Sequence, residues 1–196
     1  MFGLDRLVAD CRAALGSPSA EAAIKELLTA VVARPADIEA ALGAPRVGGI
    51  STLHHSPELT ILNVVWAPGM AIYPHDHRMW AIIGLYGGRE DNVFYRRNGG
   101  RLATAGGREL NVSDVAVLGK NVIHAVSNPL RMFAGAIHIY AGDFFSVERS
   151  EWTGGHPQGT STTWRMLDRR LRRRTHAGRE SRPKDISALR ATSSGS

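Results

Sequence analysis

The chain has 196 residues, which is enough for one domain with a substantial core and short for two. Hydrophobic residues make up 43% of it, so general disorder is excluded, and no apolar run reaches the roughly 18 residues that cross a bilayer. The formal net charge is +6, but ten of the 24 basic residues and only three of the 18 acidic residues lie at 161–196, so the basic character belongs to that segment.

Three helical segments are predicted at the start of the chain. Apolar residues recur at three- and four-residue spacing from Leu4 to Leu15 and again after Ser19, which is a suitable N-cap. A shorter helix is expected after Pro35 and should end near Gly43. Together these helices predict an N-terminal helical cap over residues 1–46.

The single cysteine, Cys11, lies on the apolar stripe of the first predicted helix, where an inert core thiol is expected. With one cysteine no disulfide can form within the chain, which suits a reducing compartment. The N-terminal stretch mixes acidic and basic residues and has no long apolar run, so it does not resemble a signal peptide. We therefore expect a cytoplasmic protein with no membrane association.

From about residue 47 the pattern changes to short apolar or alternating runs separated by Gly, Pro and Asn. Such runs with frequent turn signals are typical of an antiparallel sandwich or barrel. The predicted strand runs are Leu59–Trp66, Trp80–Tyr86, Asn92–Arg97, Val115–Leu118, Val122–Ser127 and Met132–Tyr140. We therefore predict a mainly β fold, with a barrel over residues 47–153 covered by the N-terminal helices.

Residues 154–196 are expected to form a linker and a basic, mostly disordered tail. Gly, Gln, Ser and Thr dominate the beginning of this segment, and an arginine cluster follows at 169–174. The tail contains one Trp and no recognisable fold, so binding of nucleic acid is not expected.

Three histidines have the placement of metal ligands. His75 and His77 lie two residues apart after Pro74, so on a strand both point to the same face. His124 lies on a later predicted strand, and inward-facing residues from separate strands converge in a closed barrel. Three neutral imidazoles leave positions of an octahedral metal open, as in a catalytic site. For an isolated His-x-His pair, two half-exposed strand histidines are an equally good explanation.

The context of these histidines is more specific than the pair alone. Two motifs resemble those of the cupin superfamily, whose fold is the double-stranded β-helix or jelly-roll barrel: Gly69-x5-His75-x-His77 and Gly119-x4-His124-x3-Asn128. Most cupins have a Glu ligand about four residues after the second histidine, and this chain lacks it. The nearest carboxylates, Glu90 and Asp91, follow the Gly87-Gly88 turn and are not expected to replace it.

A ligand set of three histidines without a carboxylate distinguishes the thiol dioxygenases among cupins. Residues 45–152 resemble the cysteine dioxygenase family, and His75–Arg97 is similar to its bacterial branch related to 3-mercaptopropionate dioxygenases. The resemblance implies Fe(2+) as cofactor, a small thiol and O2 as substrates, and a sulfinic acid as product. An anionic thiolate suits a metal with three neutral ligands, because it compensates the +2 charge.

The same resemblance implies roles for residues outside the ligand set. Thiol dioxygenases carry a Ser-x-His-x-Tyr triad, which His138 and Tyr140 match, although Ala136 stands in place of the serine. These two residues are the predicted catalytic pair, and a structural His-Tyr pair in the core is the alternative. Arg149 is the predicted anchor for a substrate carboxylate. Arg78 is a weaker candidate, because strand alternation turns it away from the face of the ligands.

Several alternatives stay open at this point. Arg149 also fits a surface arginine paired with Glu148 or Glu151. The chain also fits another metal-dependent cupin enzyme, such as a carbon-substrate dioxygenase or an isomerase, since the fold alone implies no activity. A non-catalytic cupin binding protein is the least favoured hypothesis. Whether the chain forms a homo-oligomer is left open.

Overall fold

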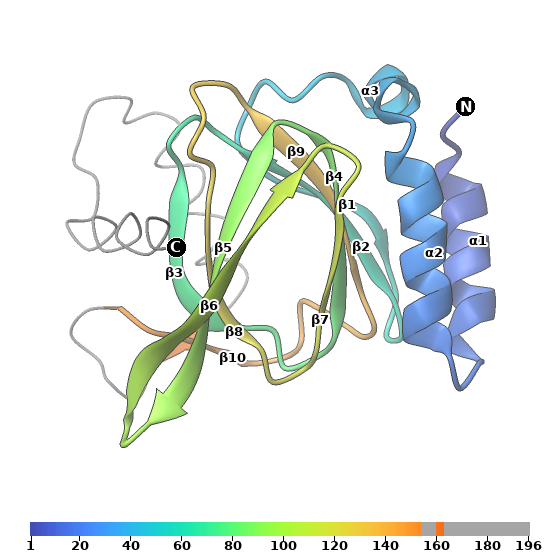
Figure 1. Ribbon diagram of the computed structural model, residues 1–196. Helices are drawn as coiled ribbons and strands as arrows, with labels where there is room; N and C mark the ends of the chain where they lie inside the picture. The colour runs from blue at the N-terminus through green and yellow to red at the C-terminus, as the bar shows by residue number, and fades with distance from the viewer. Residues whose placement is uncertain (154–159, 163–196) are drawn as a thin grey trace, which may run out of the picture.

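The computed structural model describes residues 1–153 and 160–162 and shows three helices followed by strands in two sheets (Figure 1). The helices are α1 (Leu4–Leu15), α2 (Ala20–Val32) and α3 (Pro35–Leu42). The strands are β1 (Gly49–His55), β2 (Thr60–Trp66), β3 (Ala71–Asp76), β4 (Ala81–Gly87), β5 (Arg89–Asn98), β6 (Arg101–Asn111), β7 (Val115–Leu118), β8 (Ile123–Ser127), β9 (Ala134–Tyr140), β10 (Arg149–Glu151) and β11 (Thr160–Thr162). No helix of the described part is long and apolar enough to cross a membrane.

Strand pairing defines the architecture. One antiparallel sheet has the order β1-β2-β9-β4-β7 and the other has the order β11-β10-β3-β8-β5-β6. Between β2 and β9 the pairs are nested: β5 pairs with β6, β4 with β7, β3 with β8, and β2 with β9. Nested antiparallel pairs divided between two facing sheets form a jelly roll, or double-stranded β-helix. The predicted fold class, a mainly β cupin-type barrel with N-terminal helices, is therefore confirmed.

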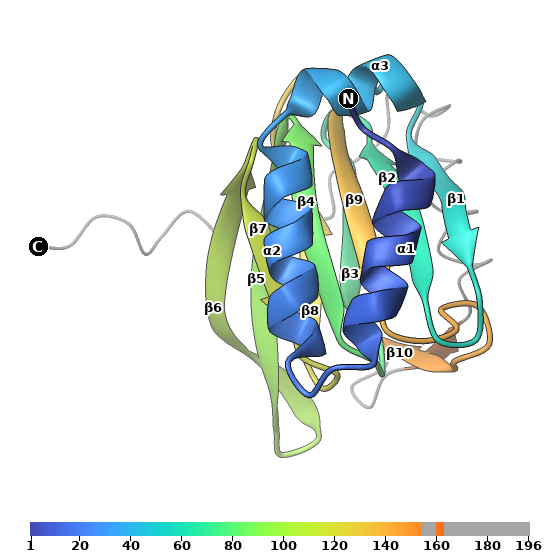
Figure 2. The ribbon, with the colours of Figure 1, turned by 90° about the vertical axis from the view of Figure 1, so that its right-hand side faces the viewer.

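Strands β2, β4 and β9 of the five-stranded sheet are buried on both faces, because the helices cover the outer side of the sheet (Figure 2), whereas the edge strand β1 is partly exposed. On β2 and β4, Ile61 and Ile82 face the helices, while their neighbours Leu62 and Ile83 face the barrel interior. Every residue of β9 is buried for the same reason. Burial on both faces explains why these strands are continuous apolar runs in the sequence rather than alternating ones.

Helix α2 packs against β4 at Gly84, and this contact leaves no room for a side chain. A Cβ atom at Gly84 would lie 2.8 Å from side-chain atoms of Leu28 and Val32. Gly84→Ala is therefore expected to push the helix off the sheet and to lower the free energy of unfolding by about 1–3 kcal/mol. Denaturant titration would measure this loss. Gly119→Ala is the matched control, because nothing lies within 4 Å of a Cβ there.

The structure differs from the sequence predictions at several strands and at one helix cap. Strands β1, β3 and β10 are not among the predicted strand runs. The edge strand β6 was not predicted, because most of its side chains are exposed and it has no apolar face to detect. Thr160–Thr162 fell within the predicted linker, but these residues pair with β10 as β11, as β-branched residues favour. The remainder of the predicted linker and tail lies outside the described residues. Ser19 is the N-cap residue of α2 but makes no side-chain capping bond.

Candidate metal centre

The barrel brings His75, His77 and His124 together. His75 lies on β3 and pairs in register with His124 on β8, while His77 directly follows the end of β3. All three side chains are buried, and one ligand nitrogen from each lies within 4.8 Å of the others. Among the described residues they form the group that fits a metal ion, and this group contains no carboxylate. The half-exposed alternative for the His-x-His pair is thus wrong.

Hydrogen bonds orient two of these imidazoles. The Nδ1 atom of His75 donates to the backbone carbonyl of Tyr73 at 3.0 Å, and Nδ1 of His124 donates to the side-chain oxygen of Asn92 at 2.8 Å. With Nδ1 protonated, Nε2 of each neutral ring carries a lone pair and is free to bind a metal.

The spacing of the nitrogens fits a bound cation. Nε2 of His77 lies 2.9 Å from Nε2 of His124. Two nitrogens bound to one ion at about 2.1 Å, with a right angle at the ion, lie about 3 Å apart. The residues present therefore fit a metal held by three imidazole nitrogens.

Burial keeps the three imidazoles neutral. Desolvation lowers the pKa of His75 to about 4 and lowers the pKa values of His77 and His124 well below their usual value. Neighbouring imidazoles and Arg149 add to this effect on His77. Neutral imidazole is the form that binds a metal, so the cluster is ready to bind near neutral pH.

Asn92 is expected to contribute to metal affinity through His124. Asn92→Leu removes the acceptor for Nδ1 of His124, so the ring loses its fixed orientation and tautomer. We expect metal affinity to fall about 10–100-fold. Competition with a chelator of known affinity would measure the change. Asn63→Leu is the control, because Asn63 accepts a hydrogen bond from Tyr86 instead of from a ligand; an equal loss in both variants would contradict the role of Asn92.

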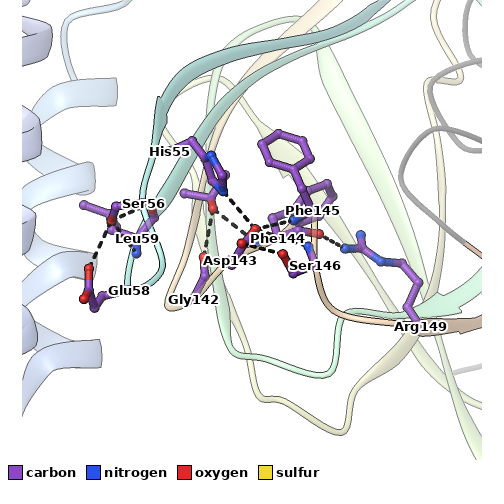
Figure 3. A network of polar contacts seen from close by, with 11 residues as sticks. His55, Ser56, Glu58, Leu59, Gly142, Asp143, Phe144, Phe145, Ser146 and Arg149 are labelled. Carbon is purple, nitrogen blue, oxygen red and sulfur yellow. Dashed lines mark hydrogen bonds and ion pairs between the residues drawn. The ribbon is translucent and has the colours of Figure 1, made fainter.

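Arg149 is buried, with 1% of its surface exposed, so the alternative of a surface arginine is wrong. Strand β10 pairs with β3 at Glu151 and His75. Because the two strands are antiparallel, Arg149, two residues before Glu151, lies opposite His77, two residues after His75. The guanidinium lies over the ring of Phe144 at 3.9 Å and donates from Nη2 to the Phe144 carbonyl (Figure 3). Its Nε and Nη1 atoms have no hydrogen-bond partner among the described residues.

A hydrogen-bonded loop positions Phe144 (Figure 3). The Asp143 carboxylate accepts from the Ser146 hydroxyl at 2.6 Å and lies 2.8 Å from Nε2 of His55. The backbone N–H of Phe144 donates to the Thr60 hydroxyl at 3.2 Å. These bonds hold the tight turn after β9 that carries the Phe144 ring and its carbonyl to Arg149.

Tyr140 connects this loop to the histidines. Its ring centroid lies 4.4 Å from that of Phe144 and 5.1 Å from that of His77. Burial raises the pKa of the Tyr140 hydroxyl, so it is a neutral group at the site. Arg78, by contrast, points outward, where it pairs with Asp76 and donates to the Ser150 hydroxyl.

His138 and Tyr140 lie on the same inward face of β9, as their spacing predicted. Nδ1 of His138 lies 3.0 Å from the Tyr140 hydroxyl. Burial lowers the pKa of His138 to about 3, so its imidazole is neutral. Ala136, two residues earlier on the same face, offers no hydroxyl, and Nε2 of His138 has no hydrogen-bond partner in the described part of the chain.

Sequence reasoning missed Glu90. Its side chain is fully buried and accepts hydrogen bonds from Trp66 at 2.9 Å and from the Asn92 amide at 3.0 Å. Its Oε2 atom lies 3.9 Å from Nε2 of His138. Among the described residues Glu90 is not part of the ligand group, as expected, but β5 lies in the opposite sheet and turns the Glu90 side chain inward, toward His138. The alternation Glu90-x-Asn92, two polar residues on one strand face, was the available signal.

Burial also changes the acidity of Glu90. Desolvation raises the pKa of its carboxyl to about 7, and the hydrogen bonds from Asn92 and Trp66 oppose this rise. Perturbed carboxyls of this kind are common in functional sites.

Comparison with known proteins finds solved structures of low similarity to this chain. No protein-family model matches the chain. A Bacillus halodurans protein is 17% identical, and the match covers 65% of this chain and 86% of that one at a TM-score of 0.47. An RmlC-like cupin from Methanocaldococcus jannaschii is 11% identical, covering 52% and 84% at a TM-score of 0.43. An oxalate oxidase is 19% identical, covering 43% and 42% at a TM-score of 0.37.

This chain thus spans less than half the length of the oxalate oxidase that it matches. The fold follows from the nested strand pairs, and the site follows from the histidine geometry. The chain is a double-stranded β-helix protein whose barrel interior holds three histidines arranged to bind a metal.

Proposed function

We propose that this chain is a non-haem iron(II) thiol dioxygenase, which converts a small thiol carboxylate and O2 into a sulfinic acid. The observation that carries the proposal is the ligand group of three neutral imidazoles with no carboxylate. A thiolate compensates the charge that such a group leaves on the metal. The substrate would resemble 3-mercaptopropionate or cysteine.

Iron(II), when bound, would lower the pKa of the thiol and supply the site at which O2 meets sulfur. The reaction is balanced without a further reductant, since R–SH and O2 together give R–SO2H and sulfur supplies all four electrons.

The remaining side chains would bind and orient the substrate. Within residues 1–153 and 160–162, two nitrogens of Arg149 have no hydrogen-bond partner, and a buried guanidinium can hold a carboxylate through paired hydrogen bonds. The hydroxyl of Tyr140 lies 3.0 Å from Nδ1 of His138 and within the electrostatic influence of Arg149, so it can hold a proton next to the substrate. The ring of Phe144 packs on Tyr140 and Arg149 and excludes water from that side.

The test is O2 uptake by purified protein loaded anaerobically with iron(II). We expect consumption of 3-mercaptopropionate or cysteine, with one sulfinate formed per O2. Iron bound without thiol turnover would refute the dioxygenase and favour the second candidate, a cupin enzyme acting on a carbon substrate. Absence of metal binding would refute both and leave a binding protein.

A further inference from the structure

A continuous set of polar contacts runs through the barrel from Tyr140 to His124. The Tyr140 hydroxyl meets Nδ1 of His138, and Nε2 of His138 faces Glu90. The other carboxylate oxygen of Glu90 accepts from Asn92, which in turn accepts from His124. Glu90 is the only charged group in this set, and it stands between the two histidines.

His138 needs a partner that its own strand does not supply. Ala136 occupies the inward position two residues before it and has no polar atom in its side chain. Glu90 reaches Nε2 of His138 from β5, in the opposite sheet, at 3.9 Å. This distance is too long for a hydrogen bond, yet a carboxylate still attracts an N–H strongly in a buried site where screening is weak.

We propose that Glu90 is the positioning residue of His138, holding its imidazole with the proton on Nε2 so that Nδ1 accepts from the Tyr140 hydroxyl. The direction of this hydrogen bond matters, because it decides whether Tyr140 is a donor to His138 or is free to donate elsewhere. The role of Glu90 in turnover rests on the proposed function, but its effect on the tautomer does not.

The same carboxylate orients a metal ligand. Because Oε1 of Glu90 accepts from the amide nitrogen of Asn92, the amide oxygen of Asn92 must face His124. One carboxyl group therefore sets the orientation of His124 through Asn92 and the tautomer of His138 directly.

The tautomer can be observed by NMR without any turnover. Full-length protein labelled with 15N at histidine would be loaded with Zn2+ as a diamagnetic probe, and His138→Gln would identify the His138 signals. We expect a protonated Nε2 and an unprotonated Nδ1 in the wild type, and a shift of the proton to Nδ1 in Glu90→Gln. A wild-type spectrum with the proton on Nδ1, or the same tautomer in both proteins, would overturn the proposal.

The pH dependence gives a second readout. The titratable groups that face Glu90 are His138 and Tyr140 from β9 and Asp91 on its own strand. Protonation of Glu90 removes the negative charge that attracts the Nε2–H of His138, so the Nε2–H form should decrease as the pH falls through about 7, the pKa to which burial raises the carboxyl. In Glu90→Gln this pH dependence should be absent; a titration that persists would contradict the proposal.

Trp66→Phe tests the same contact while keeping the carboxylate. It removes the N–H that donates to Oε2 of Glu90, so the charged form loses a stabilising bond and its pKa should rise. The tautomer change should then move to higher pH, and an unchanged midpoint would refute the role of Glu90. If thiol turnover is also found, Glu90→Gln should lower kcat about 100-fold with KM unchanged.

Discussion

Replacing His124 with alanine is expected to abolish stoichiometric binding of iron(II) and, with it, all O2 uptake. The loss should exceed the roughly 10–100-fold decrease expected when a ligand loses only its hydrogen-bond partner. His124 supplies one of three ligand nitrogens, and its Nε2 lies 2.9 Å from that of His77. Two imidazoles cannot enclose the ion, and no buried carboxylate belongs to the ligand group to replace the third. Anaerobic titration with iron(II), followed by metal analysis of the desalted protein, would measure the effect.

The matched control for this variant is His55→Ala. His55 is also a histidine of the barrel, but its ring pairs with Asp143 in the loop after β9 and does not belong to the ligand group. This control should bind one equivalent of iron. Full iron binding by His124→Ala would refute the three-histidine site.

Arg149→Met is expected to stabilise the protein and, at the same time, to damage substrate binding. The wild-type guanidinium is buried, and two of its nitrogens have no partner in the part of the chain that the structure describes; an unsatisfied buried donor costs about 1–3 kcal/mol. Met has a similar length and no polar group, so the free energy of unfolding should rise by about 1–3 kcal/mol. Thermal or denaturant unfolding of the metal-free proteins would show this increase.

The effect of Arg149→Met on binding should have the opposite sign. Two hydrogen bonds to a carboxylate contribute about 3 kcal/mol, so KM for 3-mercaptopropionate should rise about 100-fold. Cysteamine has no carboxylate and serves as the matched substrate, whose KM should hardly change. Equal losses for both thiols, or a destabilised variant, would show that Arg149 holds the loop at Phe144 rather than the substrate.

The fold could be predicted where burial leaves a pattern in the sequence. The runs of β2, β4 and β9 are recognisable because both faces of these strands are buried. Side chains such as Ile82 and Ile139 pack against the helices, and their neighbours in the sequence pack inside the barrel. Strand β6 has an exposed face and an unpaired edge, so its structure depends on pairing with β5 and not on its own composition.

In the candidate site, too, residues in local sequence motifs could be predicted, whereas contacts that depend on strand pairing could not. The pair of His75 and His77 and the pair of His138 and Tyr140 each have a fixed spacing of two residues, and His124 lies in its own short motif, so local sequence reveals them. Glu90 acts across the barrel, and its meeting with His138 depends on how β5 crosses between the sheets. The burial of Arg149 depends likewise on the pairing of β10 with β3, which three residues of sequence do not predict.

The nested order of strand pairs has a consequence for how the protein folds. The β5–β6 hairpin joins neighbouring strands, whereas each pair further out closes a longer loop at a larger entropic cost. His75 and His124 lie on the third pair of this series, and closing the two inner pairs first shortens the loop that this pair must close, so we expect the metal site to form late in folding. We therefore expect metal added during refolding to leave the early steps unchanged and to act mainly by slowing unfolding, with the native state gaining about 2.7 kcal/mol when free metal is 100 times its Kd.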